Sequence, residues 1–199
     1  MDAVAALRAG RPVLLPTDTV YGLAADAGEA GAAAVYRLKG REARQPTALL
    51  AATVADLLEL VPELPDELQA LLPGPVTLVL PNPARRFPWL CGETPDRIGV
   101  RVPQLPEAAR AAVAAVGGVL ATSANDPGGP NPASLEAVPP RIRAGCGAEI
   151  DVGPLPGTPS TVVDLTGAEP VVLREGAVPA AEVLSTIAGW RSRSRRSSS

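Results

Sequence analysis

The chain has 199 residues, 46% of them hydrophobic, a formal net charge of −3 and no histidine. This length suits one domain that buries a core without disulfides or a structural metal, and the acidic balance gives no overall attraction to nucleic acid. Because histidine is the commonest general base and the usual partner of a serine or cysteine nucleophile, its absence argues against most hydrolase and metalloenzyme mechanisms.

Neither a membrane segment nor a reactive cysteine pair is apparent in the sequence. No run of about 18 uncharged apolar residues and no basic-then-apolar leader occurs, so we expect a soluble, cytoplasmic protein that does not associate with a membrane. Cys91 and Cys146 are isolated from each other. This pattern indicates neither a zinc site nor the disulfide framework of a secreted protein.

The first quarter of the chain predicts two helices and two strands. A short helix over 2–10 begins at an aspartate cap and ends at a glycine, and the apolar run 12–15 follows it as a strand. The Ala-rich segment 28–39 predicts a helix that Gly40 ends. The apolar run 47–52 then predicts a second strand.

The middle of the chain continues this alternation. Thr53 and the aspartate three residues later resemble a capping box for a helix, and a second short helix is predicted to begin at Pro65. The segments 76–80 and 98–102 predict strands. The Pro- and Arg-containing stretch between them predicts a surface loop.

A further helix is predicted from Pro106 to Val116, followed by a buried strand over 119–122. The Pro- and Gly-rich stretch 126–133 suits neither a helix nor a strand, so it predicts a loop long enough to line a site. Ser134 can then cap a helix that reaches Ile142.

The last part predicts strands over 160–165 and 170–173 and a helix through 183–187. Alternating strands and helices indicate an α/β sheet covered by helices, in which ligands bind beyond the strand ends. We expect one domain at residues 1–189. The Arg/Ser-rich segment 190–199 lacks the apolar residues needed to offset the entropy of ordering and is predicted to be a disordered tail.

Polar residues gather at three places next to predicted strands and helices. The run 16–23, Pro-Thr-Asp-Thr-Val-Tyr-Gly-Leu, brings hydroxyls, a carboxylate and a phenol together and could hold an amino acid. Lys39 and Arg41 flank Gly40, and a mobile point charge beside a planar guanidinium could stabilise a phosphoryl group or carbonate. The run 122–125, Thr-Ser-Ala-Asn, supplies small hydroxyls and an amide.

Each cluster also has an ordinary structural interpretation, and the residues alone leave both open. Asp18 and the neighbouring threonines could bond only to local backbone groups, and Lys39 could simply favour the negative end of a helix dipole. Lys39 is the only lysine of the chain, which either has a specific cause or reflects chance. No Walker A or GxGxxG motif occurs, so a nucleotide would be bound in another way.

Seven segments together resemble the Sua5/YrdC/YciO family in their order and spacing. They run from about residue 12 to residue 176 and are Pro-Thr-Asp-Thr-Val-Tyr-Gly-Leu, Lys-Gly-Arg, Pro-Gly-Pro-Val-Thr-Leu-Val-Leu, Val-Arg-Val-Pro, Ser-Ala-Asn, Ser-Thr-Val-Val-Asp-Leu and Leu-Arg-Glu-Gly.

The resemblance implies a twisted open mixed α/β sheet with flanking helices around a large concave cavity. It also implies an L-threonylcarbamoyladenylate synthase, a nucleotidyltransferase that converts L-threonine, bicarbonate and ATP to threonylcarbamoyl-AMP and pyrophosphate for the threonylcarbamoyladenosine modification of tRNA. Adenylation of this kind needs alignment and charge stabilisation and no covalent nucleophile. A chain without histidine is compatible with it.

The resemblance also assigns roles to individual positions. The family residues that hold threonine correspond to Thr17, Arg101 and Ser160. The family positions that bind the nucleotide or its phosphates correspond to Lys39, Arg41, Ser123, Asn125 and Arg174. Lys39 and Arg41 are the two residues expected to take part in catalysis. Many members carry a histidine near the position of Leu50, where it helps to hold threonine.

The same resemblance suggests cofactors and partners. Mg²⁺ is expected to accompany ATP, without a metal site built by the protein alone and without a tightly bound cofactor. Further partners that the resemblance implies are tRNA or double-stranded RNA, and proteins that transfer the threonylcarbamoyl group onward. Two alternatives stay open: a divergent relative that makes another carbamoyl-adenylate, and an RNA-binding module that uses the Arg/Ser-rich tail.

Overall fold

The computed structural model describes residues 2–40 and 45–197. The helices are α1 (Ala3–Arg8), α2 (Glu29–Lys39), α3 (Val54–Leu60), α4 (Glu107–Ala114), α5 (Pro140–Gly145) and α6 (Ala180–Ser197), with short 3-10 helices η1 (Asp66–Leu71) and η2 (Pro88–Leu90). The strands are β1 (Val13–Pro16), β2 (Tyr21–Asp26), β3 (Ala48–Leu50), β4 (Val76–Pro81), β5 (Arg97–Arg101), β6 (Val119–Ser123), β7 (Ala148–Glu149), β8 (Thr161–Asp164) and β9 (Val171–Arg174).

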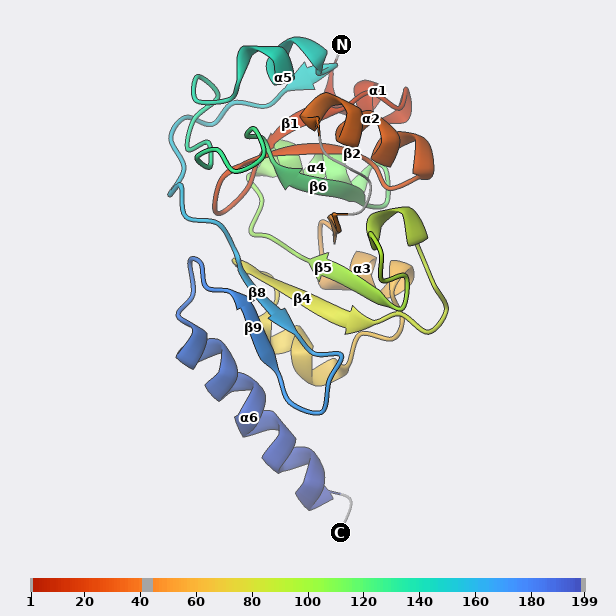
Figure 1. Ribbon diagram of the computed structural model, residues 1–199, viewed down its shortest axis with the longest axis vertical. Helices are drawn as coiled ribbons and strands as arrows, with labels where there is room; N and C mark the ends of the chain where they lie inside the picture. Colours follow the sequence, from red (N-terminus) through yellow and green to blue (C-terminus); the bar gives the residue numbers. More distant parts are fainter. Residues whose placement is uncertain (1, 41–44, 198–199) are drawn as a thin grey trace.

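Within these described residues, nine strands form one sheet in the order β7-β1-β2-β6-β3-β5-β4-β8-β9. The pairs β1–β7, β3–β5 and β4–β8 are parallel, and the other neighbouring strands are antiparallel. Helices flank the sheet along its length (Figure 1). The expected mixed α/β sheet with flanking helices is therefore confirmed.

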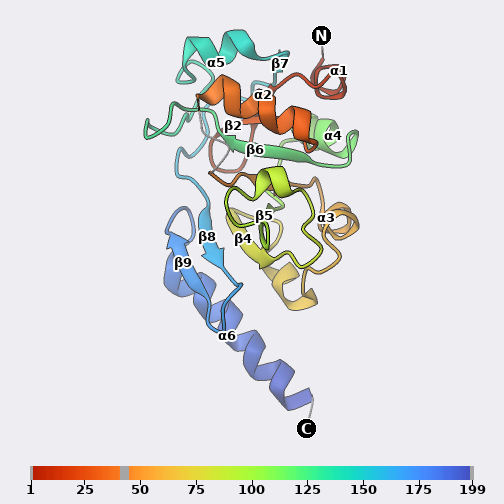
Figure 2. The same cartoon turned by 45° about the vertical axis from the view of Figure 1, so that its right-hand side comes forward.

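The short strand β3 joins the two halves of this sheet. Ala48 faces Ala121 of β6 in an antiparallel pair, whereas Leu49 faces Val100 of β5 in a parallel pair. We call strands β7-β1-β2-β6 the upper half and strands β5-β4-β8-β9 the lower half, as they lie in Figures 1 and 2. The placement of one half on the other depends on the backbone hydrogen bonds of β3.

Helices cover both faces of the upper half. Helices α1 and α4 pack on one face, where Leu7 and Val113 are buried against Val13 of β1. Helices α2 and α5 pack on the other face, where Val35 joins a core that includes Leu23 of β2. Both faces of these strands are consequently apolar, which explains why their sequence alternates so little.

The lower half is covered on one face by α3, η1 and α6. Leu57, Leu68 and Val183 from these elements are buried in the same core as Leu78 of β4 and Val163 of β8. Because side chains alternate along a strand, the residues between these core positions point to the opposite face. That opposite face lines the cavity described below.

Strands β1 and β2 form a hairpin that the sequence only half predicts. The strand over 12–15 is confirmed, but β2 was not predicted, because its Gly- and Ala-rich sequence has low strand propensity. Pro16 faces Tyr21 in the last pair, so residues 17–20 form the hairpin loop. The Tyr21 hydroxyl donates to Asp151 and to the Gly153 carbonyl, both at 2.9 Å.

Two helix predictions are wrong in their bounds or type. The helix predicted from Ser134 begins only at Pro140, because a proline disfavours helical geometry in the residue before it and is well placed in the first turn. The segment after Pro65 forms the 3-10 helix η1 in place of an α-helix. The strand predicted over 47–52 is shorter, at Ala48–Leu50.

The structure also differs from the predicted disordered tail at 190–199, because α6 continues to Ser197. Arginine favours helices, and propagation of a helix that has already begun is easier than its nucleation, so packed residues such as Ile187 can support helix beyond them. The far end of α6 projects away from the sheet (Figure 1). A domain boundary near residue 189 stays a prediction.

No helix in the described part of the chain is both long and apolar enough to cross a membrane.

We predict that Leu49→Ala lowers the free energy of unfolding by about 2–5 kcal/mol, because the fully buried leucine lies in the strand that joins the two halves. Urea denaturation followed by circular dichroism measures this change. Val171→Ala in the exposed edge strand β9 is the control and should change the free energy by less than about 0.5 kcal/mol. Equal effects of the two substitutions would contradict the assigned role of β3.

Candidate functional site

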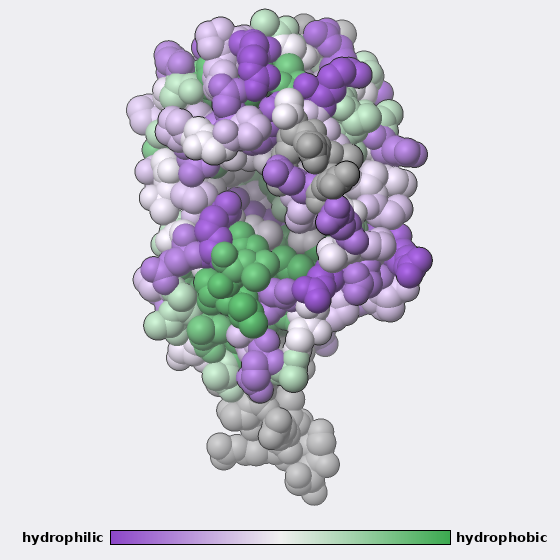
Figure 3. All heavy atoms as spheres, viewed as in Figure 1, coloured by the Kyte–Doolittle hydropathy of each residue, from purple (hydrophilic) through white to green (hydrophobic). Residues whose placement is uncertain are grey.

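A cavity of about 340 Å³ lies between the two halves of the sheet. The hairpin loop 17–20 and the ends of β3 and β6 form its wall, and the uncovered face of β5, β4, β8 and β9 forms its floor. The molecular surface is hollowed between the two halves, and hydrophobic side chains gather below the hollow (Figure 3). The cavity is therefore open to solvent and has walls of different chemical character.

The hairpin loop contributes a chain of hydrogen bonds to the wall. The Thr17 hydroxyl donates to the carbonyl of Val20 at 2.7 Å and lies 2.9 Å from the Thr19 hydroxyl, which itself accepts from Arg101 at 3.2 Å. The backbone N–H groups of Thr19 and Val20 also donate to Thr17. Thr17 and Thr19 are both buried. Their hydroxyls thus fix the shape of the loop before any ligand enters.

Asp18 acts differently from its neighbours, because its carboxylate reaches across the cavity wall. One oxygen forms an ion pair with the Arg101 guanidinium of β5, and the other accepts from the backbone N–H of Gln104 at 3.0 Å. The side chains of Asp18 and Arg101 are 11% and 8% exposed. This pair is buried on both sides and links the upper half of the sheet to the lower half.

Burial lowers the pKa of the Arg101 guanidinium, and the nearby positive charge of Arg174 lowers it further, while Asp18 opposes both effects. Arginine is so strongly basic that it keeps its charge at neutral pH despite such a shift. Arg101 therefore presents a fixed, poorly hydrated cation to the cavity. Such a cation binds a carboxylate or phosphate oxygen more strongly than an exposed one does.

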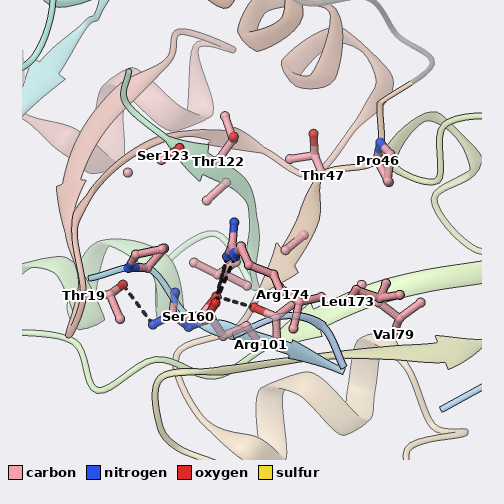
Figure 4. Close-up of a pocket in the computed structure, with 18 of the residues that line it drawn as sticks. Thr19, Pro46, Thr47, Val79, Arg101, Thr122, Ser123, Ser160, Leu173 and Arg174 are labelled. Carbon is pink, nitrogen blue, oxygen red and sulfur yellow. Dashed lines mark hydrogen bonds between the residues drawn. The ribbon is translucent and has the colours of Figure 1, made fainter. Parts of the chain in front are cut away.

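Ser160 and Arg174 lie beside Arg101 on the same side of the cavity (Figure 4). The Arg174 guanidinium donates to the Ser160 carbonyl at 2.9 and 3.1 Å and to the Ser160 hydroxyl at 3.2 Å. The same hydroxyl lies 2.9 Å from the Thr77 hydroxyl of β4. These contacts hold a second guanidinium and a second pair of hydroxyls within one polar cluster.

Lys39, Ser123 and Asn125 form a second polar cluster on the upper half. The Lys39 ammonium donates to the Ser123 carbonyl and, at 3.0 Å, to the Asn125 side-chain oxygen. The Ser123 hydroxyl donates to that same oxygen at 2.6 Å. Ser123 lines the cavity, and Lys39 and Asn125 are buried next to it without being part of the described lining. Helix α2 and strand β6 thus bring the predicted residues together.

The floor between the polar residues is apolar. Val79, Val162 and Leu173 line it, and an ion pair between Arg97 and Asp164 at 2.9 Å lies at its edge. Leu173 is exposed at 57%. The cavity thus has the charged groups of Arg101 and Arg174, an apolar floor and a charged pair at its edge. A ligand with an anionic end and a flat apolar part would match this arrangement.

The structure brings together most of the predicted site residues. Those that line the cavity are Thr17, Arg101, Ser123, Ser160 and Arg174, and those that contact a lining residue are Lys39 and Asn125. Arg41, predicted to bind phosphate and to take part in catalysis, lies outside the described residues. The binding and catalytic roles of these residues stay predictions.

Sequence reasoning missed several lining residues. Thr77 and Val79 carry no signal, because a strand with alternating exposure has the same pattern whether its open face meets water or a ligand. Thr47 also lines the cavity, and its buried hydroxyl makes no hydrogen bond in the described structure, which marks it as a polar group that a ligand or water could satisfy. The proline-threonine pair before β3 was the only signal for it.

The residues that the structure describes do not by themselves form a metal centre. Within the described part of the chain, no group of three or more His, Cys, Asp or Glu side chains could hold a metal ion. Asp164 is the one carboxylate of the described cavity lining, and it is already bonded to Arg97 and Thr166. This donor set fits a magnesium ion that arrives on phosphate oxygens, since Mg²⁺ commonly keeps its waters and few protein ligands.

The fold and the site define an α/β protein whose cavity is lined with groups that suit an anionic small molecule. Among the described residues, three arginines, of which Arg97 is paired with Asp164 at the edge, line the cavity together with several hydroxyls, and an ammonium group lies behind one wall. Preorganised donors of this kind stabilise negative charge and position reactants. The cavity has the groups that an acyl or nucleotidyl transfer without a covalent intermediate would use.

Comparison with known proteins places the chain more narrowly. The sequence profile of the Sua5/YciO/YrdC family, described as "Telomere recombination", matches residues 5–176. A threonylcarbamoyl-AMP synthase from Halorhodospira halophila is 39% identical over 154 residues, which are 75% of this chain and 78% of that protein. The chain therefore belongs to the Sua5/YciO/YrdC family.

Solved structures agree with this assignment. The Pyrococcus abyssi Sua5 complex with L-threonine has a TM-score of 0.84 at 35% identity, covering 93% of this chain and 56% of that protein. Escherichia coli YciO has a TM-score of 0.76 at 28% identity, covering 89% of this chain and 88% of that protein. The chain thus spans about half of the Pyrococcus protein and most of the other two.

We predict that Asp18→Asn destabilises the protein by about 3–5 kcal/mol, because it leaves the buried Arg101 charge without its partner. Chemical denaturation at neutral pH measures the loss. Glu107→Gln is the matched control, since it breaks the ion pair with Arg110 on the surface, where Glu107 is 77% exposed, and should cost less than about 1 kcal/mol. A similar cost for both changes would refute the importance of the buried pair.

Proposed function

We propose that the chain is an L-threonylcarbamoyladenylate synthase that joins L-threonine, bicarbonate and ATP into threonylcarbamoyl-AMP and pyrophosphate. The observation that carries this proposal is the cavity itself. It sets Arg101, Arg174 and Ser160 opposite Ser123 and the Lys39 cluster, in a chain 35% identical to a protein whose structure holds L-threonine. The reaction makes the enzyme a nucleotidyltransferase.

The amino acid is assigned to the side of the cavity near the hairpin loop. Its carboxylate would meet Arg101, whose guanidinium is buried and oriented by Asp18. Its hydroxyl would lie near Ser160, which is held by Thr77 and Arg174. Thr17 would shape this end of the cavity, because its own hydroxyl is engaged within the loop.

The nucleotide is assigned to the remaining wall and floor. Its phosphates would lie between Arg174 and the cluster of Lys39, Ser123 and Asn125. Its base would lie on the apolar floor near Leu173. Mg²⁺ would come with the phosphates, and it supplies charge neutralisation on the departing pyrophosphate.

The reaction then needs positioning more than a reactive side chain. The threonine amine and bicarbonate give a carbamate and water. A carbamate oxygen attacks the α-phosphorus, a new P–O bond forms, and the bond to the β-phosphate oxygen breaks as pyrophosphate leaves. Arg174 and the Lys39 cluster would stabilise the charge that develops on the phosphoryl oxygens. Arg41, which follows Gly40, is proposed to help at the same step.

A second candidate concerns the amino acid. Leu50 lines the cavity and faces Arg101 across the β3–β5 pair. An apolar side chain beside the proposed carboxylate site would suit an amino acid with an aliphatic side chain, and such a product would be another carbamoyl-adenylate. For threonylcarbamoyl-AMP, we propose that the product is a reactive intermediate that other proteins transfer to tRNA in the cytoplasm.

The test is a synthesis assay with purified protein, ATP, Mg²⁺, bicarbonate and each of several amino acids. We expect pyrophosphate release and an adenylate of the mass of threonylcarbamoyl-AMP, both dependent on threonine and bicarbonate. Arg101→Ala should raise the KM for threonine by about 10- to 100-fold, because charge-assisted hydrogen bonds to the carboxylate are lost.

Arg110→Ala is the control, because Arg110 lies on α4 and pairs only on the surface with Glu107. It should leave both the rate and the KM for threonine unchanged. Pyrophosphate release without threonine dependence, or a preference for an aliphatic amino acid, would replace threonine by another substrate. No adenylate with any amino acid would refute the proposal.

A further inference from the structure

Helix α2 ends at the residue that carries the only ammonium side chain of the protein. Lys39 is its last residue and the sole lysine of the chain. Gly40 then adopts a left-handed conformation with φ of 63°, which ends the helix. The final carbonyl groups of a helix have no partners within it and need donors from elsewhere.

Arg141 of helix α5 supplies those donors. Its guanidinium donates to the Leu38 carbonyl at 2.5 Å and to the Lys39 carbonyl at 3.4 Å. The same group forms an ion pair with Asp126, which lies in the loop after β6. One planar cation therefore holds together the end of α2 and the loop that follows Asn125.

The approach of α5 to α2 makes these contacts possible. Both views place α5 beside α2 at the upper end of the molecule (Figures 1 and 2). Gly145 lies against the Leu38 side chain so closely that a Cβ at position 145 would come within 3.0 Å of its methyl carbons. The glycine thus allows α5 to lie close enough for Arg141 to reach the helix end.

The contacts of Arg141 and of Lys39 form one closed circuit. The Lys39 ammonium donates to the Asn125 side chain at 3.0 Å, and Asp126 is the next residue of the chain. Asp126 forms an ion pair with Arg141, and Arg141 donates to the Lys39 carbonyl. The side chain and the backbone of Lys39 are therefore tied to the same loop from opposite sides. Neither tie involves the cavity directly.

We propose that Arg141, together with Asp126, is a positioning residue that holds Lys39 in its place behind the cavity wall. The expected effect of Arg141 on nucleotide binding rests on the proposed function, whereas its effect on the position of the Lys39 side chain does not. Arg141 and Asp126 are half-exposed, at 50% and 52% of their side chains, and exposed ion pairs contribute little to stability. Phosphoryl transfer, in contrast, depends strongly on small displacements of charged groups.

The single lysine makes a direct measurement possible. An amine-reactive reagent can modify only Lys39 and the N-terminal amine, and peptide mass spectrometry separates the two. Lys39 is 4% exposed in the intact protein. We expect Arg141→Ala to raise the rate of Lys39 modification by about three- to tenfold, because the helix end loses a cation that satisfies its carbonyls and an ion pair.

Arg143→Ala is the matched control. Arg143 lies on the same helix, two residues further on; its side chain pairs with Glu149 at 2.7 Å and donates to the Leu135 carbonyl, and neither partner belongs to α2. It should leave the modification rate of Lys39 unchanged. Asp126→Asn keeps the contacts of Arg141 with the helix and should raise the modification rate of Lys39 less than Arg141→Ala does. If Arg141→Ala folds poorly, Asp126→Asn is the variant that tests the proposal.

Nucleotide affinity gives the second readout. In the wild-type background, Arg141→Ala should weaken ATP binding measured by calorimetry by about three- to tenfold and leave the KM for threonine unchanged. In a Lys39→Ala background the same substitution should have no further effect on ATP affinity. If Arg141 acted only through general stability, its substitution would weaken the binding of both ATP and threonine, and by the same factor in both backgrounds.

The outcomes separate this proposal from the proposed function. An unchanged Lys39 modification rate in Arg141→Ala, an equal increase in Arg143→Ala, or additive effects on ATP affinity would each overturn the positioning role. Wild-type protein that makes no adenylate would overturn the proposed function alone, since the modification experiment would still decide whether Arg141 holds Lys39.

Discussion

The buried ion pair between Asp18 and Arg101 is the constraint on which the site depends. Removing two charges from water costs several kcal/mol, which their attraction offsets only with good geometry and further hydrogen bonds. Thr19 and the Gln104 backbone supply those bonds. Because Asp18 belongs to the hairpin of the upper half and Arg101 to β5 of the lower half, the pair sets how the two walls of the cavity face each other.

The junction strand β3 is a further link between the halves, and it is only three residues long. Its backbone pairs with β6 in the antiparallel sense and with β5 in the parallel sense. The two halves are therefore parts of one continuous sheet. The cavity exists because helices cover one face of the lower half and leave the other open to the hairpin loop. The short strand β3 and the buried ion pair together hold the two halves in one relative orientation.

Much of the fold could be predicted from the sequence, because long apolar segments with clear stops gave strands β4, β5, β6, β8 and β9 and helices α2 and α4. The failures have local causes. Most of strand β2 is Gly, Ala and Leu, which signal a strand weakly, and the start of α5 depends on Pro140. Polar residues beside strands and helices pointed to Thr17, Lys39, Arg41 and the run 122–125, whereas Arg101, Ser160 and Arg174 came only from the family resemblance. Asp18 as the partner of Arg101 was not predicted, because that contact joins positions 83 residues apart. Single-sequence patterns do not report such pairs.

The order of the hydrogen bonds in the hairpin loop has a consequence for the kind of ligand that fits. The Thr17 proton goes to the Val20 carbonyl, so the Thr19 proton goes to Thr17, and Thr19 receives its own hydrogen bond from Arg101. Neither hydroxyl has a proton left to give. Next to these two threonines the donor toward a ligand is the Arg101 guanidinium, so this part of the wall suits molecules that bring lone pairs.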